Sequence, residues 1–228
     1  MGAGGTRVLI TLEGIDGSGK STLRTALAEP LLDLNPLFTR EPGATWVGDS
    51  VRRAIAEQTD PVTEALLFVA DHAAHLATII RPALGKGQLV ISDRYTDSRY
   101  AYQSVTLEGV MPDPLTWLQS LHNGWTIVPD KTFLLVMPVD AALERLKAKN
   151  GREHFERKEI LEKVQKNYMG LARADPSRFV IIDAMKGKGE IAGFVATAIR
   201  QIAGSSRSHR QRSRRPPVPP PPDTRTWG

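Results

Sequence analysis

The stretch RVLITLEGIDGSGKSTLRTALAE, residues 7–29, decides the fold. An apolar run enters a glycine-rich turn, and a helical pattern of apolar residues follows. The turn matches G-x-x-x-x-G-K-[ST], with Gly14, Gly19, Lys20 and Ser21 at the fixed positions. Glycines let backbone N–H groups curl around phosphate oxygens, and the positive end of the following helix faces the anion. We therefore expect this loop to bind a nucleotide, with Lys20 on the β/γ-phosphates and Ser21 on Mg²⁺.

Apolar, β-rich runs alternate with stretches of helical period along the chain. Five such runs stand out: Arg7–Leu12, Pro36–Thr39, Gln88–Ser92, Thr132–Met137 and Phe179–Ile182. The alternation predicts βαβ units and a parallel sheet covered by helices on both faces. Helices are expected from Asp60, an N-cap residue followed by proline, to about Gly85, and over 138–151 and 156–174.

The chain of 228 residues is long enough for one α/β domain, and its composition is ordinary for a soluble globular protein. The absence of cysteine excludes disulfides, thiolate metal sites and cysteine nucleophiles. No apolar run approaches the roughly 20 residues that span a membrane, and the N-terminus lacks a signal-peptide pattern. We expect a cytoplasmic protein with no membrane partner.

The net charge of +5 belongs to the C-terminal tail. From Gly204 onward there are six arginines and one aspartate, so residues 1–203 sum to zero. We therefore expect no nucleic-acid partner for the folded part. The tail 204–228 is basic, then proline-rich, and has little to bury, so we expect disorder with polyproline II character. A solvated tail, a proline-motif ligand and an RNA-contacting arm all stay open, and the sequence names no partner for it.

Two further strand ends deliver charged residues. Arg40 follows the second apolar run, and Asp93 and Arg94 follow the third. Parallel strands end at one edge of the sheet, where an arginine suits a phosphate dianion and a carboxylate suits a metal or water. Arg40 also fits an ordinary surface loop. On the long helix, Phe68 and His72 share a face that suits stacking on a base and reading its edge, although a phenylalanine there is also typical of a core.

Together these stretches resemble the thymidylate kinase family. The resemblance runs in order from Val8 to about Ala174, and more loosely to Ile202, through the motifs LEGIDGSGKST, TREPG, LLF-x-AD, DRY-x-DS and AYQ. It implies a three-layer P-loop kinase fold over residues 1–203, with a five-stranded parallel sheet and a short lid at about 147–157. It also implies a homodimer that transfers the γ-phosphoryl group of MgATP to dTMP, giving dTDP for dTTP biosynthesis.

The resemblance implies roles for individual residues. ATP would be bound by Gly14, Ile15, Asp16, Gly17, Ser18, Gly19, Lys20 and Ser21. The acceptor nucleotide would be bound by Asp16, Arg40, Arg52, Phe68, His72, Arg94, Tyr102 and Gln103. Asp93 would help Ser21 to organise Mg²⁺, and Tyr102 would lie by the deoxyribose C2′.

The catalytic cation is expected in the lid. Some relatives carry an arginine inside the phosphate loop, at the position held here by Gly17. Without it, the cation should come from the basic segment 147–157. We favour Arg152, with Arg157 and Lys149 as alternates, beside Lys20, Asp93 and Arg94 as catalytic residues.

Four positions depart from the family pattern. Ala44 follows TREPG where glycine is usual, and Val136 replaces a frequent acidic residue. Arg99 stands where relatives often have a small hydroxyl residue. His72 stands where an arginine usually grips the thymine edge. Because histidine is the weaker donor, we hypothesise softer base selection that extends to dUMP.

Two rival functions stay open at this stage. One is another deoxynucleotide or deoxynucleoside kinase on the same fold. The other is a non-catalytic P-loop nucleotide-binding regulator whose tail recruits a partner. The intact set of Lys20, Ser21, Asp93 and Arg94 argues against the regulator.

Overall fold

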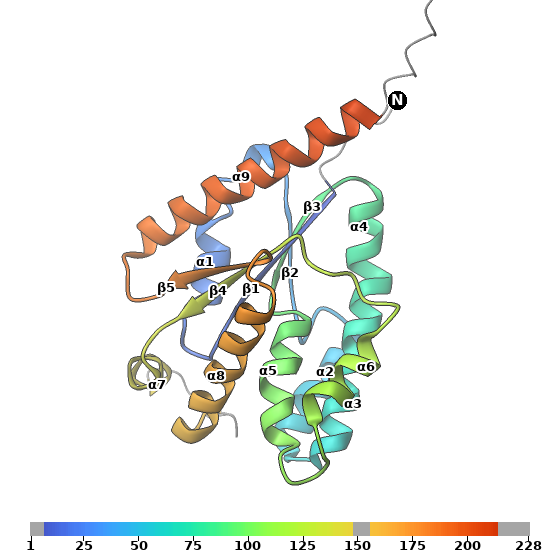
Figure 1. Ribbon diagram of the computed structural model, residues 1–228, viewed down its shortest axis with the longest axis vertical. Coiled ribbons are helices and arrows are strands. Elements are labelled where there is room, and N and C mark those ends of the chain that lie inside the picture. Colours follow the sequence, from blue (N-terminus) through green and yellow to red (C-terminus); the bar gives the residue numbers. More distant parts are fainter. Residues whose placement is uncertain (1–6, 148–155, 214–228) are drawn as a thin grey trace, which may run out of the picture.

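The computed structural model describes residues 7–147 and 156–213, except for the side chains of 206–213 (Figure 1). Five strands form one parallel sheet in the order β2-β3-β1-β4-β5. Their bounds are β1 Val8–Gly14, β2 Leu37–Arg40, β3 Leu89–Asp93, β4 Lys131–Val136 and β5 Phe179–Asp183. Each overlaps its predicted run, so the parallel α/β sheet is confirmed.

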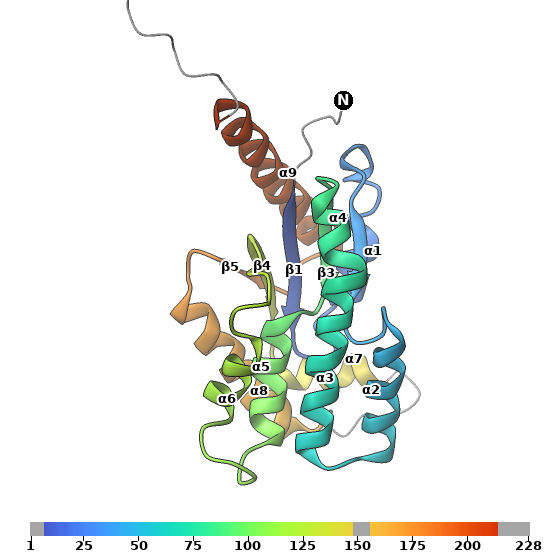
Figure 2. The ribbon, with the colours of Figure 1, turned by 90° about the vertical axis from the view of Figure 1, so that its right-hand side faces the viewer.

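Helices cover both faces of this sheet (Figures 1 and 2). They are α1 Lys20–Ala26, η1 Leu32–Leu34, α2 Trp46–Glu57, α3 Pro61–His75, η2 Leu76–Ile80, α4 Arg81–Gly85, α5 Thr96–Thr106, α6 Pro114–His122, α7 Val139–Lys147, α8 Lys158–Ala174 and α9 Lys188–Ser213. Along β1, Val8, Ile10 and Leu12 pack with α1 and α9, whereas Leu9 packs with η2 and α4. The central strand is therefore buried on both sides, which explains its continuous apolar sequence.

The predicted long helix is one continuous run made of α3, the π-helical turn η2 and α4. Asp60 caps it: Oδ1 accepts hydrogen bonds from the backbone N–H groups of Val62 at 3.1 Å and Thr63 at 3.0 Å. By length and composition alone, this run could cross a membrane. Its inward face nevertheless carries buried polar side chains that pack within the protein, namely Glu64, Asp71, His72 and His75. We therefore interpret it as a core helix.

The structure differs from the sequence prediction at the start of the tail. Helix α9 continues past Gly204 to Ser213, so this segment is helical rather than disordered. The reason lies in its packed part, where Val195, Ile199 and Ala203 recur at helical spacing and are buried. Once such packing has nucleated a helix, each further residue is added at little cost. Residues 214–228 lie outside the described part of the chain, and the division at 203 stays a prediction.

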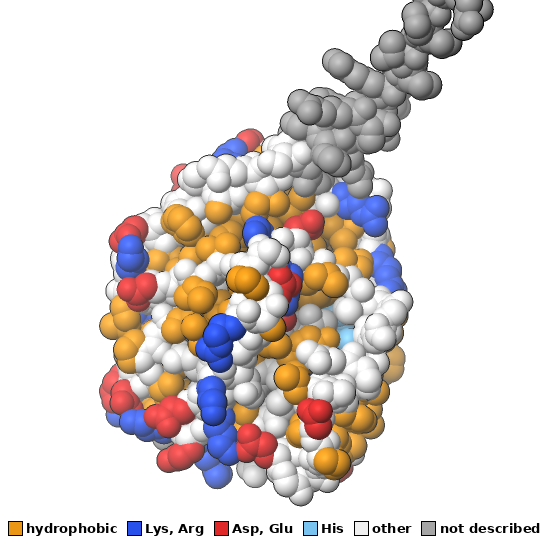
Figure 3. All heavy atoms as spheres, viewed as in Figure 1, with side chains coloured by type: hydrophobic (Ala, Val, Ile, Leu, Met, Phe, Trp, Pro, Cys, Tyr) orange, Lys and Arg blue, Asp and Glu red, His pale blue; other side chains and the backbone are white. Residues whose placement is uncertain are grey.

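Charge is mixed on the molecular face shown in Figure 3. Lysine and arginine side chains form a short row near the middle of this face, with acidic ones beside it and at the left edge, and apolar side chains gather below α9 over β4 and β5. No broad basic surface is visible on the described residues of this face. This pattern agrees with the charge balance of residues 1–203.

The cap of α3 gives a stability prediction. Asp60→Ala leaves the Val62 and Thr63 N–H groups without their side-chain acceptor, so we expect the Tm to fall by about 2–4 °C in a thermal unfolding scan. Glu29→Ala, which removes an exposed acidic residue outside any cap, should leave the Tm unchanged. Equal Tm values for the Asp60 variant and the wild type would contradict the capping role.

Candidate active site

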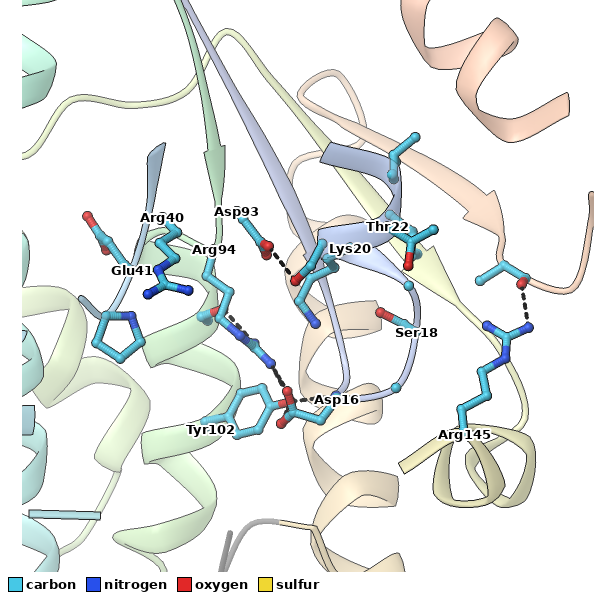
Figure 4. Close-up of a pocket in the computed structure, with 18 of the residues that line it drawn as sticks. Asp16, Ser18, Lys20, Thr22, Arg40, Glu41, Asp93, Arg94, Tyr102 and Arg145 are labelled. Atoms are coloured by element: carbon cyan, nitrogen blue, oxygen red, sulfur yellow. Dashed lines mark hydrogen bonds and ion pairs between the residues drawn. The ribbon is translucent and has the colours of Figure 1, made fainter. Parts of the chain in front are cut away.

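The described residues enclose a cleft of about 680 Å³ at the carboxyl edge of the sheet. It opens beside β1, where the strand order reverses, which is the expected ligand crevice of an open parallel sheet. The phosphate loop runs between two sides of this cleft, which we call its arms: Arg40 and Tyr102 lie on one side of the loop and Arg145 on the other (Figure 4). One arm is lined by Arg40, Arg52, Phe68, Arg99, Tyr102 and Gln103, and the other by Arg145, Ala184, Lys186, Lys188 and Ile191.

The phosphate loop joins the end of β1 to the start of α1, as its motif predicts. Gly14 has φ +141°, and a Cβ there would lie 2.4 Å from the Leu135 carbonyl oxygen. Lys20 Nζ donates to the Gly14 and Ile15 carbonyls at 3.0 and 2.9 Å. Burial and the neighbouring Arg94 charge lower the pKa of Lys20 to about 8. Ser18 Oγ is buried and has no hydrogen-bond partner among the described residues. An unpaired hydroxyl and a desolvated ammonium suit phosphate oxygens.

A hydroxyl and a carboxylate meet beside the loop. Ser21 Oγ donates to Asp93 Oδ2 at 2.8 Å (Figure 4). Both are oxygen donors of the kind Mg²⁺ prefers, and Mg²⁺ usually takes its remaining ligands from water and substrate phosphates. Among the described residues, no cluster of three or more His, Asp or Glu side chains could hold a metal. The pair therefore fits a nucleotide-bound Mg²⁺ better than a metal caged by protein alone.

The predicted Arg94 and Asp16 form an ion pair across the cleft floor (Figure 4). Tyr102 OH donates to Asp16 Oδ2 at 2.8 Å and accepts from Arg94 Nη2 at 3.1 Å. Burial would raise the pKa of Asp16, but the Arg94 and Lys20 charges lower it to about 2. Asp16 is therefore ionised at neutral pH and holds the guanidinium in the cleft.

A second carboxylate lies beneath this pair. Glu13 is fully buried and accepts hydrogen bonds from the Tyr95 N–H at 2.7 Å and from the Ser98 and Tyr168 hydroxyls at 2.6 and 2.9 Å. Burial and the nearby Asp97 raise the pKa of Glu13 to about 7. Ser98 Oγ also accepts a hydrogen bond from Arg94 Nη1 at 3.0 Å. The group formed by Glu13, Ser98 and Tyr168, here called the Glu13 cluster, therefore helps to hold the Arg94 side chain in position.

The thymidylate kinase family model matches residues 12–193. The chain belongs to the thymidylate kinase family. A protein of Methanoculleus marisnigri named "Probable thymidylate kinase" is 66% identical over 200 residues, which cover 88% of this chain and 98% of that one. Proteins of the same name from Methanospirillum hungatei and Natronomonas pharaonis are 57% and 46% identical, over 85% and 81% of this chain and 94% and 93% of theirs.

The structure brings most of the residues suggested by the family resemblance to the cleft. Arg40, Arg52, Phe68, Arg94, Tyr102 and Gln103 all line it, together with Asp93 and the loop residues 16–21. Gly14 and Ile15 lie behind the loop, where their carbonyls hold Lys20. Arg52 packs against Gly43, where a Cβ would lie 1.9 Å from its Nη1. The TREPG glycine thus makes room for this guanidinium.

His72 is the exception among the predicted substrate-binding residues. Its side chain is 0% exposed and does not line the cleft. Nδ1 bonds Glu41 Oε1 at 2.9 Å, and Nε2 bonds Thr126 Oγ1 at 2.7 Å, so both ring nitrogens are occupied. The sequence argument that His72 reads the base directly, and softens base selection, therefore loses its geometric basis.

Gly17 stands where some family members carry an arginine. It has φ +81°, and a Cβ there would lie 2.5 Å from the Ala142 carbonyl oxygen of α7. A side chain at this position would have to displace that helix. The predicted lid cation Arg152 and its alternate Lys149 lie outside the described residues. The other alternate, Arg157, is exposed and does not line the cleft.

Sequence reasoning missed the cations of the second arm. Arg145 of α7 donates from Nη2 to the Ala184 carbonyl at 3.2 Å and lines the cleft (Figure 4). Lys186 and Lys188 lie at the junction of β5 and α9. The fourth and fifth strand ends are the signal that could have located them, because the carboxyl ends of all parallel strands reach the same edge.

The titration of Glu13 gives a pH prediction. Its folded pKa of about 7 lies above the ordinary value of 4.5, so between these pH values the folded state holds a proton that the unfolded state has released. The free energy of unfolding contributed by Glu13 must fall as pH rises through this window. We expect Glu13→Gln to remove that decline in urea unfolding at pH 5 and pH 8. Glu57→Gln, an exposed control, should retain it. An unchanged pH dependence in the Glu13 variant would contradict the raised pKa.

Proposed function

We propose that this protein transfers the γ-phosphoryl group of ATP to dTMP, giving dTDP. The observation that carries the proposal is the two-armed cleft, in which one phosphate loop separates two sets of cationic side chains. A kinase needs such an arrangement, because a donor and an acceptor phosphate must meet in line. Membership of the thymidylate kinase family supports dTMP as the acceptor.

The donor side takes ATP. The loop amides and Lys20 bind its phosphates, and the second arm with Arg145 takes the nucleoside. Ser21 and Asp93 would hold Mg²⁺, which would neutralise negative charge on the phosphates. The 2.8 Å contact between these two side chains supports their joint role.

The acceptor side takes dTMP. Arg40, Arg52 and Arg94 clamp its phosphate, as guanidinium groups suit a dianion. Asp16 holds Arg94 in place and faces the acceptor, and Tyr102 closes the site beside the deoxyribose. Phe68 stacks on the base, and Gln103 binds its edge. All seven residues line the same cleft, which supports these roles.

Catalysis in this scheme is positioning and charge neutralisation. No side-chain nucleophile is needed, because the acceptor phosphate oxygen attacks directly. Lys20 and Arg94 neutralise the phosphates from the floor of the cleft. Arg152 completes the cationic shell from the lid. The close approach of Ala142 to Gly17 supports a source outside the phosphate loop.

The remaining expectations are part of the same proposal. The protein acts in the cytoplasm as a homodimer, as the family resemblance suggests, and gel filtration with light scattering tests the assembly. The nearest rival is a kinase of the same fold that acts on another deoxynucleotide or deoxynucleoside. The non-catalytic regulator is not favoured, because the described cleft retains Lys20, Ser21, Asp93 and Arg94.

A coupled ADP-release assay tests the reaction. With MgATP and a panel of dTMP, dUMP, dCMP, dGMP and thymidine, we expect dTMP to give the highest kcat/KM. Lys20→Ala should lower kcat at least about 100-fold, because it removes the ammonium group that neutralises negative charge on the phosphoryl group during transfer. A wild-type enzyme that turns over none of the monophosphates would overturn the kinase function, and a preference for thymidine would favour the rival.

Two variants test whether Arg152 of the predicted lid or Arg145 of α7 is the catalytic cation. We expect Arg152→Ala to lower kcat about 100-fold or more, with a small change in the KM for dTMP, since it acts on the transition state. Arg145→Ala should mainly raise the KM for ATP. The reverse assignment, a kcat loss at Arg145 and none at Arg152, would move the catalytic cation to α7.

A further inference from the structure

The acceptor arm of the cleft contains two buried hydrogen-bond donors that nothing in the described protein satisfies. Arg99 and Gln103 are both 2% exposed, lie one helical turn apart on α5 and line the cleft. Arg99 Nε and the side-chain nitrogen of Gln103 have no hydrogen-bond partner among the described residues. Buried donors are rarely left unpaired in folded proteins. A ligand with acceptor atoms at this point would satisfy both.

The Arg99 guanidinium is fixed by its other nitrogens. Nη1 donates to the Tyr95 carbonyl at 2.9 Å, and Nη2 forms an ion pair with Glu41. The planar group therefore has little freedom to rotate, and its Nε–H keeps one direction. A donor held in this way is pre-organised to discriminate between ligand atoms.

Glu41 is in turn fixed by two histidines of α3. Its Oε1 accepts from Nδ1 of His72 at 2.9 Å and Nδ1 of His75 at 2.6 Å. The opposite ring nitrogens contact hydroxyls: His72 Nε2 lies 2.7 Å from Thr126 Oγ1, and His75 Nε2 lies 2.6 Å from Thr39 Oγ1. Burial would raise the pKa of Glu41, but Arg99 and His72 hold it well below its usual range. Glu41 therefore stays charged and keeps Arg99 in place.

We propose that Arg99 is a specificity-determining residue that donates from Nε to a carbonyl oxygen on the edge of the acceptor base. Gln103 donates from its side-chain nitrogen to the second lone pair of the same oxygen, and Phe68 of the neighbouring helix provides the stacking surface. This assignment rests on the proposed dTMP kinase function. The residue that contacts the base edge thus comes from α5. His72 of α3, which was expected to make that contact, instead bonds Glu41, the partner of Arg99.

The discrimination follows from the chemistry of the bases. Thymine presents a carbonyl oxygen at position 4, an acceptor, where cytosine presents an amino group, a donor. Opposite cytosine, the Arg99 N–H would face another donor and stay unpaired in a buried site, which is unfavourable. We expect this mismatch to cost about 10- to 100-fold in binding or turnover.

The sharpest test compares dTMP with 5-methyl-dCMP, which keeps the methyl group and changes only the hydrogen-bonding edge. Wild type should prefer dTMP in kcat/KM and in calorimetric affinity measured without ATP. In Arg99→Met, this preference should fall at least 10-fold, mainly through a loss for dTMP. Arg178→Met is the matched control, because Arg178 is also a largely buried arginine, paired with Asp97, and does not line the cleft. It should retain the wild-type preference.

A second variant separates specificity from folding. Arg99→Met leaves Glu41 without its cation, so the double variant Arg99→Met/Glu41→Gln removes both charges and keeps the acceptor for the histidines. It should show the same loss of preference. A preference retained in the folded double variant, or absent from the wild type, would overturn the role of Arg99.

Different results would contradict the proposed dTMP kinase function and the proposed role of Arg99 in base selection. If the wild type phosphorylates dTMP but the Arg99 variants discriminate as it does, only the specificity assignment fails. If the wild type turns over no monophosphate, the proposed function fails. The calorimetric titrations with dTMP and 5-methyl-dCMP still decide whether Arg99 reads a base edge.

Discussion

The ion pair between Arg94 and Asp16 is the contact on which the cleft depends. It joins the end of β3 to the loop after β1, two segments far apart in sequence whose strands are neighbours in the sheet. Arg94 adopts φ +69°, uncommon for a residue with a side chain, and its N–H donates to the Leu12 carbonyl at 3.0 Å. This backbone turn aims the guanidinium back across β1. A strained turn of this kind persists only where its surroundings enforce it, and here Asp16, Tyr102 and the Glu13 cluster do so.

In the acceptor arm, the buried carboxylate of Glu41 connects several elements of the fold. Glu41 follows β2 and contacts α3 through two histidines and α5 through Arg99. An isolated carboxylate in this position would be very costly to bury, but here each oxygen has a donor. Removing Glu41 would leave Arg99 without its ion pair and both histidines without their carboxylate partner. The position of Arg99 therefore depends in part on His72 and His75, which do not line the cleft.

Much of this arrangement could be predicted from the sequence, because its signals are local. The phosphate loop, the cap at Asp60 and the five apolar runs each depend on short-range spacing. The strand ends then indicated Arg40, Asp93 and Arg94, since parallel topology gathers those ends at one edge. The family resemblance added Phe68, Tyr102 and Gln103, which also line the cleft.

The errors arose where a side chain's environment depends on distant segments. His72 has the right place on α3 to face a base, yet Glu41 and Thr126, from 31 and 54 residues away, bind both of its ring nitrogens. No periodicity along the chain encodes that competition. The helical start of the tail was missed for a related reason. Its helix is set by buried residues before Gly204, whereas the local composition of arginine and serine suggested disorder.

The absence of a side chain at Gly17 has consequences beyond the loop itself. A Cβ there would lie 2.5 Å from the Ala142 oxygen, so glycine allows α7 to lie directly against the phosphate loop. That approach brings Arg145 of the same helix into the cleft, close to Gly19. Helix α7 is described as far as Lys147, the first residue of the predicted lid. In this chain, position 17 has no side chain, and α7 packs against the loop there. We therefore expect the cations that complete the site to come from α7 and from the predicted lid.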